Sequence, residues 1–127
     1  MAFTRDLLRG SLDLMILSDL NHGSRYGYQI LRSLRERSAG RIDLKAGTLY
    51  PILHKLERDG CVRSWWDDST GRDRKWYALT EKGRRRLAAD AREWLDYAAC
   101  VRGFLRPMTG VLNGGPSSPA AAEGELA

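Results

Sequence analysis

Residues 47–60 read GTLYPILHKLERDG, and an arginine-rich segment follows them closely. Their branched apolar side chains recur at i, i+3, i+4 and i+7, at Leu49, Ile52, Leu53 and Leu56. This spacing predicts a short helix with one apolar stripe, whose opposite face is small at its start and basic further along. A helix that enters a DNA major groove needs such a face, slim beside the bases and cationic beside the phosphates. Taken alone, however, the pattern suits an ordinary helix with a solvated face better.

The segment after residue 60 favours the DNA interpretation. Two aromatic-rich runs, CVRSWW (61–66) and RKWYAL (74–79), flank a polar loop that contains a glycine, and this predicts a β-hairpin. Basic residues cluster at and just after the hairpin tip, at Arg72, Arg74 and Lys75. In a winged helix, the helix enters the major groove and such a hairpin touches the flanking phosphates or the minor groove. The alternative is a structural hairpin whose charges only serve solubility.

Three further helices are expected. The first spans about residues 4–20 and is apolar on two sides, which predicts packing against its own core and against a second subunit. The second spans about residues 26–39. The last begins after the N-cap Thr80 and runs to residue 105 or 106, where Pro107 is expected to end it.

The expected fold is mainly α with a small β-hairpin, a winged helix-turn-helix plus a long C-terminal dimerisation helix. Residues 4–79 are predicted to form the DNA-binding domain and residues 80–106 the dimerisation helix. Residues 107–127 lack hydrophobic periodicity and are expected to form a disordered tail. Pro51 is expected within the first turn or so of its helix, where the missing N–H costs little.

The long C-terminal helix carries apolar residues at spacings of three and four over about 25 residues, which resembles a coiled-coil seam. A core this small cannot bury such a seam, so we expect a second subunit to cover it. The alternative is a helix that folds back over its own domain. The expected dimer interface comprises Leu7, Leu14, Leu17, Leu87, Ala91, Trp94, Leu95, Ala98, Val101 and Leu105.

Composition limits the class of protein. The chain has 127 residues, is 43% hydrophobic and has a formal net charge of +5, which favours one domain and a polyanionic partner. Cys61 and Cys100 are far apart and fit no zinc spacing, so reduced, buried thiols are expected, with no metal site and no cofactor. No apolar run approaches the roughly 20 residues of a membrane span, and no secretory leader is recognisable. We therefore expect a cytoplasmic protein without a membrane partner.

Five motifs in order resemble the signatures of the PadR family of bacterial transcriptional regulators. They are LRGSLD (8–13), YGYQI (26–30), GTLYP (47–51), LERDG (56–60) and GRDRKWYALTEKG (71–83). The resemblance covers about residues 4–106. The chain departs from the family pattern at Trp76, where tyrosine is more frequent, and at Gln29, where glutamate is common. Neither difference threatens the fold.

The resemblance implies a homodimer whose two winged helices bind a pseudo-palindromic operator in double-stranded DNA, usually as a repressor. A single helix after the wing matches the shorter subgroup of the family. In short members that bind aromatic drugs, a tryptophan on this helix pairs across the dimer axis around a flat ligand, and Trp94 occupies the matching place. Trp94 would otherwise serve interface packing. A regulator without a small-molecule effector, controlled by a protein partner, redox or metal, is the alternative.

The expected DNA contacts come from the presumed groove-facing helix, the start of the helix before it, and the wing. They are Tyr26, Tyr28, Lys45, Thr48, Tyr50, Pro51, His54, Lys55, Arg58, Arg72, Arg74 and Lys75. Catalysis is not expected, because His22 and His54 lack a serine, cysteine or acid at the spacing of a known catalytic motif. A winged helix used only for protein contacts remains a competing function, although the basic helix face argues against it.

Overall fold

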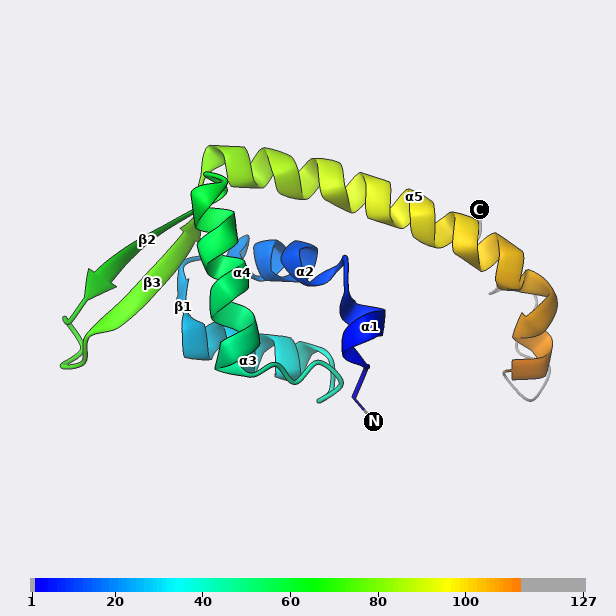
Figure 1. The fold of residues 1–127 in the computed structure, drawn as a ribbon, viewed down its shortest axis with the longest axis horizontal. Coiled ribbons are helices and arrows are strands. Elements are labelled where there is room, and N and C mark those ends of the chain that lie inside the picture. Colours follow the sequence, from blue (N-terminus) through cyan, green and yellow to red (C-terminus); the bar gives the residue numbers. More distant parts are fainter. Residues whose placement is uncertain (1, 113–127) are drawn as a thin grey trace. The chain divides into compact units, whose positions relative to one another are not determined.

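The computed structural model describes residues 2–112, and the chain divides into two compact units, Met1–Asp90 and Ala91–Ala127. The predicted fold class is confirmed: most elements are helices, with one small sheet and a long C-terminal helix (Figure 1). In chain order they are α1 (Arg5–Leu8), α2 (Leu12–Leu20), β1 (Arg25–Tyr26), α3 (Gly27–Arg37), α4 (Ala46–Arg58), β2 (Val62–Asp67), β3 (Arg74–Leu79) and α5 (Glu81–Leu112). Residues 113–127 of the predicted tail lie outside the described residues.

Within the described residues the strands form one antiparallel sheet in the order β1-β3-β2. Strands β2 and β3 are the predicted hairpin, with Trp66 opposite Lys75, and we call them and the loop 68–73 the wing. The two-residue β1 pairs with β3, placing Tyr26 opposite Trp76. So short a strand has no alternation for a sequence pattern to detect. Through β1, the sheet holds the start of α3 beside the wing.

The apolar stripe predicted for α4 lies in the core. Leu49, Leu53 and Leu56 are fully buried, and Ile52 packs against the same cluster. The other elements contribute Ile16, Leu17, Leu20, Ile30, Leu34, Val62, Tyr77 and Leu79. Burying one leucine side chain stabilises the fold by about 1.5–3 kcal/mol. Rotation of α4 would lose this burial, so its polar face is held toward solvent.

The first predicted helix is two helices. Residues 9–11 separate α1 from α2, because Gly10 has a φ of +90°, a conformation that glycine adopts without strain. Leu17 is fully buried in the core of its own chain, so it cannot contact a partner subunit as predicted. Leu7 is exposed and Leu14 is partly buried, so both side chains remain accessible on this part of the chain.

Both helical prolines lie deeper in their helices than predicted. Pro51 is in the second turn of α4, and α5 continues through Pro107 to Leu112. A proline deprives the carbonyl four residues earlier of its helical hydrogen bond, and these carbonyls belong to Gly47 and Gly103. Both glycines are exposed, so water can reach them. The prediction that Pro107 ends the helix is therefore wrong.

Asp19 of α2 is a buried carboxylate that no sequence pattern singled out. The Ser33 hydroxyl of α3 donates a hydrogen bond of 2.5 Å to its Oδ1. Arg25 Nε of β1 and Arg37 Nη1 of α3 each lie 3.3 Å from one of its oxygens. A buried charge is tolerated when it is paired in this way. Asp19 thereby joins α2 to β1 and α3, the segments that begin the candidate site.

Candidate nucleic-acid interface

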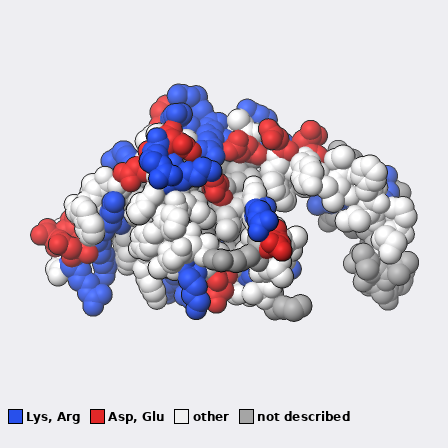
Figure 2. Space-filling model, viewed as in Figure 1, with Lys and Arg blue, Asp and Glu red and all other residues white. Residues whose placement is uncertain are grey.

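A cleft of about 730 Å³ lies between the start of α3, the polar face of α4 and the wing. It brings together many of the residues predicted to contact DNA: Tyr26, Tyr28, Tyr50, His54, Arg72, Arg74 and Lys75. Figure 2 shows basic side chains along the lower side of the wing and acidic ones at its tip. Tyrosine hydroxyls beside lysine and arginine suit a phosphate backbone, to which both types of group bind. The cleft is therefore the candidate nucleic-acid interface.

The remaining predicted contacts lie on α4 or just before it, outside the lining of the cleft: Lys45, Thr48, Pro51, Lys55 and Arg58. Thr48 is partly buried, and the others are exposed. Lys55 Nζ lies 3.8 Å from Asp13 Oδ2 of α2. Its charge is therefore partly compensated within the protein, which the helical pattern of residues 47–60 did not indicate.

The start of α3 holds Tyr26 firmly at one wall of the cleft. The backbone N–H of Tyr26 donates to the side-chain oxygen of Gln29 at 3.1 Å, as in a capping box. The Tyr26 ring meets Trp76 edge-on at 5.1 Å, and the Arg74 guanidinium lies 4.4 Å from the centre of the same ring. A cation over an aromatic face is attracted to it. Arg74 is thus positioned by Tyr26 as well as by its own strand.

Gly27 leaves room for the end of the Tyr50 side chain at the start of α3. A Cβ atom at this position would overlap the Tyr50 hydroxyl, so the end of that side chain would have to move. Tyr50 is partly buried, and its ring lies against the start of α3. The contact explains why a glycine occurs in the YGYQI motif between two tyrosines. It sets the position of the Tyr50 hydroxyl in the cleft.

Sequence reasoning missed Trp66, Tyr77 and Asp73 in the lining of the cleft. Trp66 is 66% exposed although it is a large aromatic residue. The register could have identified it, because Trp66 pairs with Lys75, a predicted contact, and paired residues share one face of a sheet. Asp73 adds a negative charge that any bound phosphate would have to avoid.

Tyr77 lies at the bottom of the cleft and is fully buried. Among the described residues its hydroxyl has no hydrogen-bond partner. Burial raises the pKa of Tyr77 to about 12, and the neighbouring Tyr50 and Glu57 act in the same direction. The side chain therefore stays neutral throughout the physiological range and serves packing rather than charge.

A second surface lies on the part of α5 that belongs to the unit Ala91–Ala127. Its exposed apolar residues recur at spacings of three and four, at Trp94, Tyr97, Val101, Phe104, Leu105 and Met108, and we call this set the α5 stripe. Trp94 is 42% exposed and Phe104 is 81% exposed. Leu95 is exposed too, whereas Ala91 and Ala98 are partly buried. Leu87, also predicted at the interface, is partly buried and packs against the core of its own chain. Apolar side chains so exposed in a row are typical of an interaction surface.

The two cysteines differ in their surroundings. Cys61 is buried as predicted, whereas Cys100 of α5 is exposed and not buried as predicted. Over the described part of the chain, no group of three or more histidine, cysteine or acidic residues could hold a metal ion. None of the helices in that part has the length and apolar character needed to cross a membrane.

Known proteins resemble this chain in sequence and in fold. Residues 16–89 match the model of a family described as the transcriptional regulator PadR-like family. The chain is similar to transcriptional regulator Rv3488 of Mycobacterium tuberculosis, with 34% identity over 99 residues that cover 78% of this chain and 90% of the relative.

Two solved structures are also similar. One is a transcriptional regulator from Clostridium thermocellum, with a TM-score of 0.74 and 30% identity, covering 79% of this chain and 98% of that one. The other is a PadR family transcriptional regulator from Eggerthella lenta, with a TM-score of 0.71 and 34% identity, covering 79% of this chain and 86% of that one.

The Tyr77 environment predicts how stability depends on alkaline pH. The folded pKa is raised above 10, so the stability that neutral Tyr77 contributes is present below pH 10 and is lost between pH 10 and about 12. One proton contributes a slope of at most about 1.4 kcal/mol per pH unit. Denaturant unfolding of Tyr77→Phe should lack this part of the alkaline decline. Equal declines in the variant and the wild type would contradict the assignment.

Proposed function

The chain belongs to the PadR-like family of transcriptional regulators, and we propose that it is a homodimeric repressor of a pseudo-palindromic operator. The family consists of transcriptional regulators that bind DNA, not of enzymes. The observation that carries the proposal for this chain is the cleft, which places tyrosine hydroxyls and three wing cations beside the polar face of α4. We place the protein in the cytoplasm, where a bacterial operator lies.

In this proposal α4 enters the major groove. Gly47, Pro51 and His54 are exposed on its outer face, so the helix is slim where it would approach base edges. The wing would follow the neighbouring phosphates. Arg72 is exposed and forms no ion pair among the described residues, so its charge is available to a phosphate. Trp66 would pack against the sugars of the same strand.

Dimerisation through α5 would supply the second half of the operator contact. The α5 stripe is an extended apolar surface, and its spacing fits a partner helix. A second copy of the chain presents the same stripe, so a two-fold axis would bury both together. Leu7 of α1 is exposed and apolar and would add to this interface. Two joined winged helices then match two half-sites about one DNA turn apart.

We also propose that a small, flat aromatic effector binds between the two copies of Trp94. The exposed indole offers a stacking surface, and offset stacking of aromatic rings contributes about 0.5–1.5 kcal/mol beyond burial. An effector bound there would change the separation of the winged helices. It would shift operator affinity about 5–150-fold for a coupling free energy of 1–3 kcal/mol.

The first experiment concerns the wing. Replacing Arg72, Arg74 and Lys75 together by alanine should weaken binding to all duplexes, because phosphate contacts carry no sequence information. The slope of log affinity against log salt should fall by up to about three phosphate contacts. The matched control is alanine at Lys82, Arg84 and Arg85, exposed cations at the start of α5. Equal slopes for the two triple variants would remove the wing from the interface.

The second experiment concerns oligomeric state. Phe104→Asp should convert the dimer to a monomer in sedimentation, because a charge would be buried in an apolar interface. Operator affinity should fall toward the affinity for random duplex. Ala99→Asp adds the same charge to an exposed position on the opposite face of α5 and should remain dimeric. A wild-type protein that sediments as a monomer at micromolar concentration would overturn the dimer proposal.

The third experiment concerns the effector. Planar aromatic compounds should quench tryptophan fluorescence in the wild type and release the operator in a gel-shift assay. Both effects should be lost in Trp94→Ala, because the stacking surface is gone. Quenching that persists in this variant would place the ligand at Trp65, Trp66 or Trp76 instead.

A further inference from the structure

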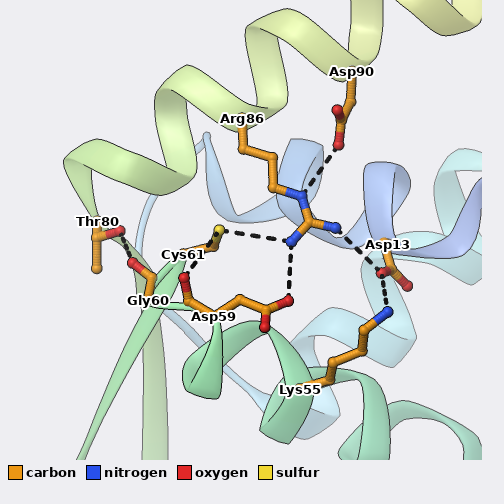
Figure 3. Close-up of polar contacts among 8 residues, drawn as sticks. All are labelled: Asp13, Lys55, Asp59, Gly60, Cys61, Thr80, Arg86 and Asp90. Carbon is orange, nitrogen blue, oxygen red and sulfur yellow. Dashed lines mark hydrogen bonds and ion pairs between the residues drawn. The ribbon is translucent and has the colours of Figure 1, made fainter.

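Arg86 of α5 joins separate parts of the winged helix through one side chain. Figure 3 shows its guanidinium among Asp13 of α2, Asp59 at the end of α4, Cys61 and Asp90. All of these residues belong to the unit Met1–Asp90. The Arg86 side chain is 30% exposed, so it is neither a core residue nor an ordinary surface cation.

Each nitrogen of the guanidinium has its own partner. Nε lies 3.2 Å from Asp90 Oδ2, and Nη2 lies 3.8 Å from Asp13 Oδ2. Nη1 lies 3.3 Å from Asp59 Oδ2 and 3.7 Å from Cys61 Sγ. Contact with Cys61 and then with Asp90 raises the pKa of Arg86. A planar guanidinium with a fixed fork can serve partners in several directions, which a lysine cannot do.

The start of α5 is also attached beside Cys61, nearly two turns before Arg86. Thr80 Oγ1 donates to the Gly60 carbonyl at 2.6 Å, and the Thr80 N–H donates to the Cys61 carbonyl at 3.0 Å. A Cβ at Gly83 would overlap this Cys61 carbonyl, so the helix backbone lies directly against it. These contacts fix a point on α5. A second point is needed to fix its direction, and Arg86 supplies one.

The same cluster reaches the groove-facing helix. Asp13 Oδ2 lies 3.8 Å from Arg86 Nη2 and also 3.8 Å from Lys55 Nζ of α4. Asp59 is the C-cap residue of α4. One arginine on α5 is therefore connected to the last turn of α4 through Asp13 and Lys55, and to its C-cap through Asp59.

We infer that Arg86 is a positioning residue for operator recognition, which sets the direction of α4 relative to the first turns of α5. The inference rests on the proposed function, because α5 would carry this direction to the dimer interface. Loss of Arg86 leaves the cleft and its cations in place. It loosens the first turns of α5 against α4, so the dimer no longer selects one separation of half-sites.

The test compares Arg86→Gln with Arg85→Gln, an equal loss of charge at an exposed neighbour. The operator is the duplex that the wild type selects from a randomised pool. Affinity is measured for this duplex, for versions with one or two base pairs added or removed between half-sites, and for random duplex. Arg86→Gln should bind the duplex with the selected spacing about 10-fold more weakly, a loss within the usual range of coupling free energies. It should also discriminate less between spacings. Its affinity for random duplex should equal that of Arg85→Gln.

Arg86→Lys should restore little of the spacing preference, since an ammonium cannot hold three carboxylates in fixed directions. If Arg86→Gln does not fold, as judged by thermal melting, Asp59→Asn removes one of the α4 contacts and should show the same change in weaker form. Identical spacing profiles for Arg86→Gln and Arg85→Gln would overturn the inference. A wild type that selects no duplex would overturn the proposed function itself.

Discussion

The burial of one side of α4 is the constraint on which the other features depend. Leu49, Leu53 and Leu56 are fully enclosed by the other helices and by the sheet. The loss of even one of these side chains from the core would cost a few kcal/mol, a large share of the stability of a small domain. The helix therefore has one available orientation. The residues between the leucines must face solvent beside the wing, which is how the cleft arises.

Much of the fold could be predicted from local sequence patterns. The helical period around residue 53, the hairpin with its loop, and the N-cap at Thr80 each depend on residues close in sequence, and the structure contains all three. The structure also groups Tyr26, His54 and the wing cations, all predicted DNA contacts, in one cleft. This grouping follows from the order of helix and hairpin in a winged helix.

The sequence predictions fail where a residue distant in sequence or a backbone conformation determines the structure. The sequence pattern favours one continuous helix, but Gly10 interrupts it with a positive φ. Such a backbone conformation cannot be seen in a sequence pattern. Pro107 remains within α5 because water can reach the exposed Gly103 carbonyl. Asp19 and Arg86 find partners on other elements, and no spacing along the sequence identifies such partners.

The contact between Gly27 and Tyr50 links two positions that lie on different helices. A substitution at either position changes which side chains fit at the other. While the tyrosine ring keeps its position, a side chain at position 27 would overlap it, but a small residue at position 50 would open this space. The two positions should therefore vary together among related regulators, and redesign of DNA preference at position 50 has to treat them as one unit.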